Sequence, residues 1–192
     1  MRLTVHSKMG GEVGYMATAI EGIMTVKPFD ALKPEVMFNS HLMGFDMDRF
    51  FATIVDKPNI AIVCQQEDER IFGVTYTQPI AAFNEKVHDP TITAFLCRSW
   101  FDDEPFVKWT VKKKEQENVF IRVCNKSTSG VVNVGVEGLG QLWIGKATST
   151  SFCENLSKVF DRMKDKQLTD RSGRDSGQVY HSKCVIAITF DS

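Results

Sequence analysis

The clearest helical pattern in the chain lies between residues 47 and 55. Apolar side chains recur there at i, i+3, i+4, i+7 and i+8, which places them on one wide face of an α-helix: Met47, Phe50, Phe51, Ile54 and Val55. Asp46 stands immediately before this run and is a suitable N-cap. Pro58 disfavours helical geometry in the residue before it, so we expect the helix to end near Lys57.

A β-hairpin is predicted directly after this helix. Residues 59–65 (NIAIVCQ) are apolar on both alternating faces, as in a strand buried on both sides in the middle of a sheet under a helix. The polar run QEDER is expected to form the turn, and residues 71–77 (IFGVTYT) to return as the partner strand. We expect this hairpin to supply the surface against which Phe50 and Phe51 pack.

Further short strands are predicted along the rest of the chain. They are expected at residues 35–39, 91–98, 106–111, 119–124, 130–136, 141–145 and 184–190. Their connections carry Gly, Pro, Asp and Asn, and no helices alternate with them. This spacing is typical of two antiparallel sheets packed face to face. The predicted fold class is therefore α+β, mainly β: a two-sheet antiparallel β-sandwich flanked by a few short helices.

The N-terminal region differs from this body. In residues 1–34 apolar side chains recur at three and four, which predicts a short helix, before Pro28 and Pro34 interrupt regular structure. We therefore expect residues 1–34 to form a short helix and linker that pack on a main domain of residues 35–192. Near the other end, residues 152–163 suit a short helix or turn. Residues 164–178 are polar enough to form a long mobile loop.

Composition excludes several classes of protein. The chain has 192 residues, a formal net charge of −1 and 43% hydrophobic residues, as expected of a soluble globular protein without a bulk field for nucleic acid or anionic lipid. No secretory signal or apolar run of about 18 residues is present, so we expect no membrane insertion and a cytoplasmic or nuclear location. The odd count of five cysteines does not suggest a disulfide framework.

The order of the segments resembles a known family, the TLDc domain. The resemblance covers residues 35–192 and rests on six stretches in sequence: FNSHLMGFDMDRFF, KPNIAIVCQQEDERIFGVTYTQPI, DPTITAFLCR, VFIRVC, LWIG and CVIAITF. The segment GVEGLGQLWIG departs from the family pattern, because it has fewer clustered glycines and Gln141 stands in place of the usual acid.

The resemblance implies a β-sandwich with helices on its rim. TLDc proteins have no agreed reaction, are tied to resistance to oxidative stress, and in several cases bind the vacuolar-type proton pump. We therefore expect a non-enzymatic protein-interaction module of a stress response that binds and regulates pump subunits, with no catalytic residue and no cofactor. Recognition is expected in loops held by the sandwich, at residues 84–89, 102–105 and 164–178.

A second hypothesis is a stress-linked regulator that binds DNA. Its candidate residues form a Lys/Arg surface patch: Lys108, Lys112, Lys113, Lys114, Arg171 and Arg174. Trp109 lies among the lysines, and a basic patch with an aromatic ring can engage phosphate and base together. Acidic residues interleave with both basic runs, which is more typical of a solvated surface.

A third hypothesis is a weak thiol-based peroxide-handling protein. Cys153 lies in a predicted polar turn and is expected to be the most exposed thiol, and Cys184 has His181 and Lys183 as positive neighbours. The alternative for Cys184 is that it opens a buried strand and simply packs. The four histidines are scattered without ligand spacing, so no metal site is predicted.

Overall fold

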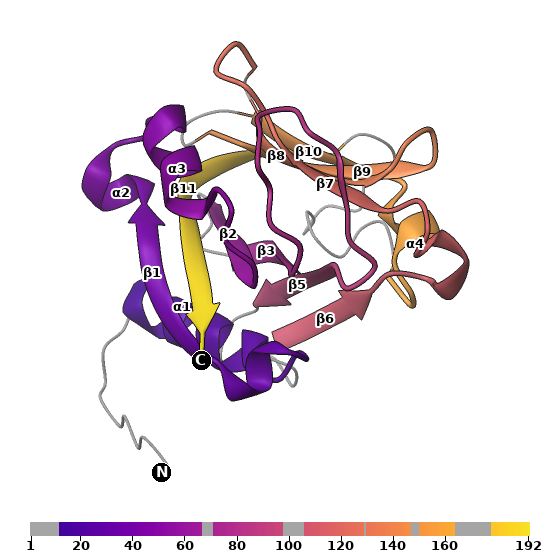
Figure 1. Cartoon of the computed structure of the whole chain (residues 1–192), viewed down its shortest axis with the longest axis horizontal. Helices are drawn as coiled ribbons and strands as arrows, with labels where there is room; N and C mark the ends of the chain where they lie inside the picture. Colours follow the sequence, from indigo (N-terminus) through magenta and orange to yellow (C-terminus); the bar gives the residue numbers. More distant parts are fainter. Residues whose placement is uncertain (1–11, 67–70, 98–105, 129, 147–149, 164–177) are drawn as a thin grey trace.

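The computed structural model describes residues 12–66, 71–97, 106–128, 130–146, 150–163 and 178–192 (Figure 1). In this part of the chain, short antiparallel strands form two sheets that pack against each other, with a few short helices at the margins. The predicted fold class, a mainly β antiparallel sandwich with short helices, is confirmed.

The strands divide between the sheets as follows. The first sheet has the order β1 (Lys33–Asn39), β11 (Gln178–Asp191), β2 (Ile60–Gln66), β3 (Ile71–Tyr76), β5 (Thr93–Cys97) and β6 (Phe106–Thr110). The second has the order β4 (Val87–His88), β7 (Phe120–Val123), β8 (Gly130–Val136), β9 (Gly140–Gly145), β10 (Thr150–Glu154) and the start of β11.

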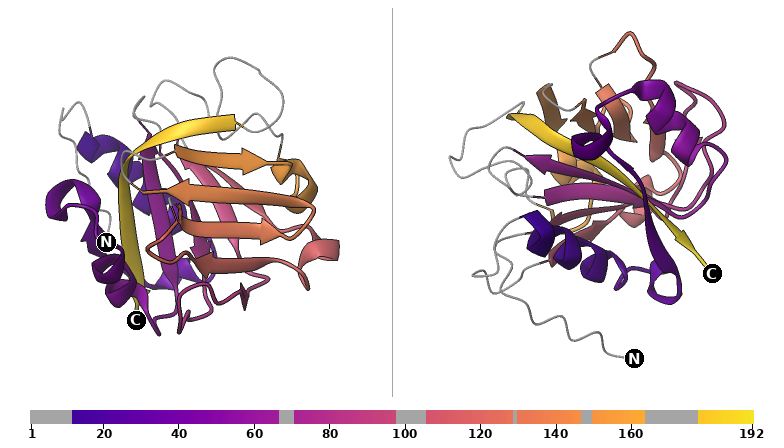
Figure 2. Two further views of the ribbon diagram at one scale, coloured as in Figure 1. Left: turned by 90° about the horizontal axis from the view of Figure 1, so that it is seen from above. Right: turned by 90° about the vertical axis from the view of Figure 1, so that its left-hand side faces the viewer.

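Strand β11 joins the two sheets. Its residues 178–181 pair with β10, and its residues 182–189 pair with β2. In Figure 2 (left) this yellow strand bends between the sheets, and the orange strands of the second sheet run across the purple strands of the first. The sequence predicted only residues 184–190 as a strand. Pairing with β10 extends it back to Gln178, and pairing with β1 extends it forward to Asp191.

The main core lies between the sheets and includes the helix predicted at residues 47–55. Helix α3 (Met47–Ile54) begins as expected, because the Asp46 carboxylate accepts a hydrogen bond from the backbone N–H of Arg49 at 2.8 Å. Its main neighbours are β1 and β11 rather than the predicted hairpin. Phe50 packs edge-on against Phe38 of β1, with the ring centroids 5.4 Å apart. In the sheet order, β1 and β11 lie on the side of β2 away from β3.

The opposite face of the first sheet is covered by helix α1 (Glu12–Ile23) and the 3₁₀ turn η1 (Phe29–Ala31). Phe29 meets Phe190 of β11 in a T-shaped contact with ring centroids 4.9 Å apart. Gly22 is needed in α1 because a Cβ there would overlap the ring of Phe106. With apolar layers on both faces, every residue of β2 is buried, as the double-sided apolar pattern predicted.

Three other short elements complete the described structure: α2 (Ser40–Met43), η2 (Lys113–Glu115) and α4 (Leu156–Val159). Strands β4 and β10 were not predicted from the sequence. Of the expected polar loop at residues 164–178, residues 164–177 lie outside the described residues. None of the helices in the described part of the chain has both the length and the apolar character needed to cross a bilayer.

Candidate functional site

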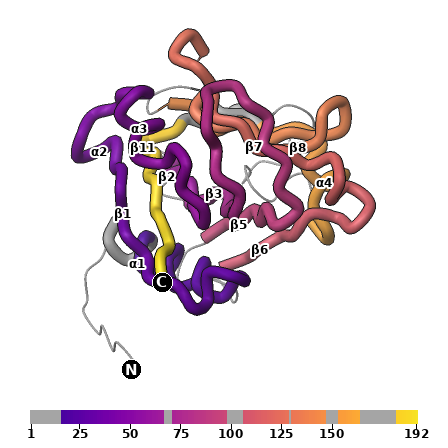
Figure 3. The backbone as a smooth tube through the Cα atoms, in the orientation of Figure 1, coloured from indigo at the N-terminus to yellow at the C-terminus, as the bar shows by residue number. Residues whose placement is uncertain are grey.

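The connection between β3 and β5, residues 77–92, leaves the first sheet and reaches the second before it returns (Figure 3). We call it the β3–β5 loop. Its base is held by Asp89, whose buried carboxylate accepts hydrogen bonds from the backbone N–H groups of Thr77, Gln78 and Thr91 at 2.5, 3.0 and 2.8 Å. A carboxylate with several backbone donors satisfies the polar groups that such a turn would otherwise leave unpaired.

The far end of the β3–β5 loop is attached to the second sheet and to α3. The backbone N–H of Asn84 donates to the carbonyl of Val123 at 2.7 Å, and the Asn84 side-chain oxygen accepts from the N–H of Asn125 at 3.2 Å. The ring of Phe83 stacks on Phe51 at a centroid distance of 4.1 Å. The loop is therefore fixed at both ends rather than free to sample many conformations.

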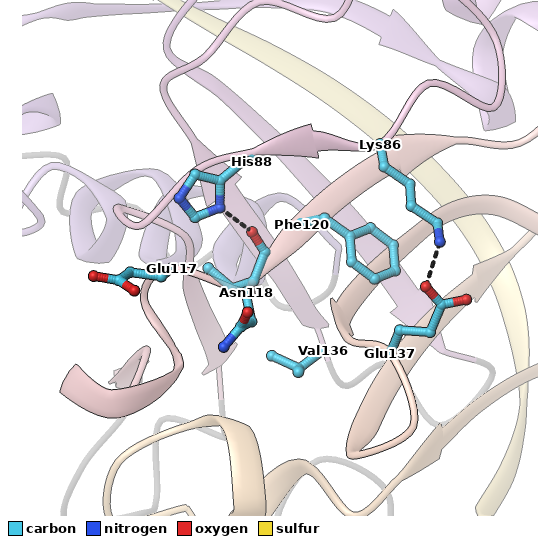
Figure 4. Close-up of a pocket in the computed structure, with 8 residues that line it drawn as sticks. Lys86, His88, Glu117, Asn118, Phe120, Val136 and Glu137 are labelled. Atoms are coloured by element: carbon cyan, nitrogen blue, oxygen red, sulfur yellow. Dashed lines mark hydrogen bonds and ion pairs between the residues drawn. The ribbon is translucent and has the colours of Figure 1, made fainter.

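This anchoring places β4 at the edge of the second sheet, where His88 pairs with Phe120 of β7. Beside this edge lies an open pocket of about 540 Å³, within the range of roughly 300–1,000 Å³ usual for ligand sites. We call it the β4 pocket (Figure 4). It is lined by Lys86, His88, Glu117, Asn118, Val119, Phe120, Val136 and Glu137.

A cation occupies one side of the β4 pocket. The Lys86 ammonium lies 5.3 Å from the centroid of the Phe120 ring and 2.5 Å from a carboxylate oxygen of Glu137. The side chains of Lys86 and Glu137 are 42% and 74% exposed. The hydrogen bond and the charge of Lys86 hold the pKa of Glu137 below its ordinary value, and the charge of Arg122 adds a smaller effect in the same direction.

The other side of the β4 pocket presents hydrogen-bond acceptors. The Nδ1 atom of His88 lies 2.7 Å from the carbonyl oxygen of Val119. A carbonyl only accepts, so Nδ1 carries the hydrogen, and in this tautomer the Nε2 atom is an acceptor. Glu117 and Asn118 are exposed on the same rim. The pocket thus combines an aromatic face, two carboxylates and neutral acceptors.

The basic patch of the DNA-binding hypothesis is divided by the structure. Lys112 and Lys113 line a second hollow of about 540 Å³ with Thr110, Val111, Gln116 and Asp161, which we call the β6 pocket. Lys108 is directed elsewhere, because its ammonium donates to the carbonyl of Thr25, after α1, at 2.8 Å. Lys114 is exposed and pairs with Glu115 at 3.5 Å. Arg171 and Arg174 lie outside the described residues.

Trp109 does not serve as the exposed ring that this hypothesis used. Its side chain is 4% exposed and belongs to the core between the sheets. Alternate residues of β6 face opposite sides, so Trp109 points inward where its exposed neighbours Lys108 and Thr110 point outward. The ammonium of Lys112 is also engaged, since it donates to the carbonyl of Ser157 at 2.6 Å.

All five cysteines are buried. The expectation that Cys153 is exposed is wrong: it is 4% exposed, because residues 150–154 form β10 and its side chain enters the core between the sheets. Cys184 is buried in the apolar cluster on the outer face of the first sheet, with its sulfur 3.3 Å from the Asn39 side-chain oxygen. The side chain of His181 lies outside the described part. Burial raises the pKa of Cys64 and Cys97 to about 12, which disfavours the reactive thiolate.

Of the three recognition loops expected from the sequence, residues 102–105 and most of 164–178 lie outside the described residues. The third, residues 84–89, supplies Lys86 and His88 to the β4 pocket, and the sequence did not indicate the other residues of its lining. These other residues come from two further segments, 117–120 and 136–137, and no local motif joins the segments. The pairing of β4 with β7 and of β7 with β8 brings them together. Among the described residues, no group of three or more His, Cys, Asp or Glu side chains is placed to hold a metal ion.

Comparison with known protein families identifies a match over most of the chain. The family model of the TLDc domain matches residues 15–176, from within α1 to shortly before β11. No curated protein matches the chain. The match begins before residue 35, and the expected division of the chain at residue 34 stays a prediction.

Proposed function

Because the chain belongs to the TLDc domain family, we propose that it is a non-enzymatic protein-interaction module that docks on the vacuolar-type proton pump and regulates it in an oxidative stress response. The observation that carries this proposal is the anchored β3–β5 loop. Rigid scaffolds that hold loops at fixed positions are a common basis of recognition. Here the sandwich is the scaffold, and the loop presents exposed charged side chains beside the β4 pocket.

The anchoring of the β3–β5 loop lowers the entropic cost of binding a partner. A loop already held by Asp89, Asn84 and Phe83 loses little further freedom when a partner covers it, so less of the interaction energy is spent on ordering. The rim is charged and exposed, which suits a partner that associates and leaves again. These properties fit a regulatory contact with a large assembly.

The proposal is tested by capture and by pump activity. The purified chain, immobilised and incubated with detergent extracts of pump-containing membranes, should retain pump subunits detected by specific antibodies at low and moderate salt. Addition of the chain to the same membranes should change the rate of ATP hydrolysis that is sensitive to a pump inhibitor. Absence of pump subunits at both salt concentrations, with unchanged hydrolysis, would refute pump binding.

A test of the stress role uses survival. Cells that lack the protein should lose viability in peroxide, and reintroduction of the wild-type chain should restore it. Survival that is independent of the chain would argue against a part in the oxidative stress response.

A further inference from the structure

We propose that the β4 pocket binds a lysine or arginine side chain of a protein partner, and that Lys86 occupies this position in the free protein. This inference rests on the proposed function as a protein-interaction module, and it adds the chemical class of the partner's anchor residue. The partner is a protein segment with an exposed basic side chain.

The first argument is the position of the Lys86 ammonium itself. A cation within about 6 Å of a ring centroid is attracted by the negative face of the ring, and Lys86 meets this condition over Phe120 at 5.3 Å. The carboxylate of Glu137 supplies the opposite charge on the same ammonium. The pocket therefore already shows which kind of group it accepts.

The second argument is that Lys86 is held loosely enough to be displaced. Lys86 and Glu137 are 42% and 74% exposed, and exposed ion pairs of this kind add little to stability. The lysine side chain is a flexible four-carbon stem, so it can turn into solvent without a change in the backbone. Arg122, whose charge also lowers the pKa of Glu137, contacts a different ring, because its guanidinium lies 5.2 Å from the ring centroid of Trp143.

The third argument is the remainder of the rim. Glu117 and Glu137 lie on opposite sides of the pocket in Figure 4, with His88 and Asn118 between them. A guanidinium has five N–H donors and no acceptor. The Nε2 lone pair of His88, the Asn118 side-chain oxygen and the Glu117 carboxylate are acceptors that Lys86 does not engage within the described hydrogen bonds. An incoming arginine can use more of the pocket than Lys86 does.

The test uses a labelled Gly/Ser peptide with one central arginine and a second peptide in which citrulline, which is neutral and nearly isosteric, replaces the arginine. Titration into the ¹⁵N-labelled chain should shift the amide resonances of residues 118–120 and 136–137 with the arginine peptide and not with the citrulline peptide. Binding of both peptides alike, or shifts confined to another surface, would overturn the inference.

Variants separate the competing lysine from the carboxylate that receives the cation. Lys86→Ala removes the competitor and should tighten arginine-peptide binding by roughly threefold to tenfold, while Glu137→Gln should weaken it by roughly tenfold. Lys126→Ala is the matched control, because it removes the cation of another exposed ion pair, with Asp48, that does not line the pocket. The proposal would be contradicted if Lys86→Ala bound the arginine peptide more weakly than the wild-type chain. It would also be contradicted if Lys126→Ala weakened binding as much as Glu137→Gln.

The two proposals fail separately. Peptide binding at residues 118–120 and 136–137 without capture of pump subunits would support the inference and refute the pump as partner. Capture of pump subunits that is unchanged by Glu137→Gln, with no peptide binding, would refute the inference and support the proposed function.

Discussion

The β4 pocket and the β6 pocket have the same volume, about 540 Å³, but they are formed by different kinds of sequence. The β6 pocket lies at the most basic run of the chain, VKKKE, whereas the β4 pocket is built from separate, unremarkable positions. Yet Lys112 in the β6 pocket is bonded to a backbone carbonyl, and Lys86 in the β4 pocket lies exposed on an aromatic ring. The aromatic ring and the carboxylate that already hold a cation, rather than local charge density, distinguish the β4 pocket as the stronger candidate for binding.

The two pockets also differ in what holds their walls. The β4 pocket depends on the β3–β5 loop and therefore on the buried carboxylate of Asp89. The wall of the β6 pocket is fastened by the Lys112 ammonium and by the backbone bond from Lys112 N–H to Val159. Each wall can be weakened separately, and the following predictions run from the largest expected effect to the smallest.

Asp89→Ala should lower the free energy of unfolding by about 3 kcal/mol or more. The change removes the charged acceptor of the part-buried N–H groups of Thr77, Gln78 and Thr91, and one hydrogen bond to a charged group contributes about 1.5–3 kcal/mol. Urea unfolding followed by fluorescence measures the difference. Amide shifts at residues 118–120 and 136–137 should change with it, since the loop forms one wall of the β4 pocket.

The matched control is Asp161→Ala, which removes an aspartate from the rim of the β6 pocket. Its side chain is 59% exposed, so the free energy of unfolding should change by no more than about 0.5 kcal/mol. Similar losses in both variants would show that Asp89 is not a special anchor and would remove this difference between the pockets.

Lys112→Ala should destabilise the fold by about 1–2 kcal/mol, because a hydrogen bond from a charged donor to the half-buried carbonyl of Ser157 is lost. Lys113→Ala alters the same pocket at an exposed side chain and should stay within about 0.5 kcal/mol. Thermal unfolding of the pair provides the comparison. Equal stabilities would mean that Lys112 is as free as its neighbour.

Much of the fold could be predicted from the sequence because local patterns have local causes. The apolar face of residues 47–55 and the capping position of Asp46 define α3, and the double-sided pattern of β2 reflects a sheet covered on both faces. Strand β10 could not be predicted, since Thr150–Glu154 is a polar, short segment that becomes a strand only between β9 and β11. That pairing also buries Cys153, which local polarity had placed in a turn.

The candidate site was less predictable than the fold. Residues 84–89 could be chosen as a recognition loop from their turn composition alone. The pairing of Lys86 with Glu137 joins residues 51 positions apart, and no property of either residue indicates the other. For Trp109 the local sequence was misleading. Its lysine neighbours suggested an exposed ring, but the side chains of β6 alternate between the two faces of the sheet, and Trp109 lies on the face that packs in the core.

The DNA-binding hypothesis gives a prediction specific to the β6 pocket. If Lys113 of this pocket and the adjacent Lys114 contact phosphates, Lys113→Glu with Lys114→Glu should lower affinity for a labelled DNA oligonucleotide by about tenfold at low salt and reduce the salt slope by about 2. Lys86→Glu makes a charge reversal at the β4 pocket and serves as the control. Gel shifts at several salt concentrations measure both. No shift by the wild-type chain at low salt would exclude this role.

The smallest effect concerns the ionisation of Glu137. Lys86 stabilises the charged carboxylate, so the folded-state pKa of Glu137 lies below its unfolded value, and the associated stability is present above the unfolded pKa and lost as the pH falls through the folded one. Lys86→Ala should therefore raise the pKa of Glu137 toward its ordinary value, as measured by the ¹³C shift of the carboxyl group during acid titration. Lys112→Ala, at the β6 pocket, should leave that pKa unchanged. An unaltered titration in Lys86→Ala would show that the ammonium does not pair with Glu137 in solution. The claim that Lys86 occupies the cation position of the β4 pocket in the free protein would then be wrong.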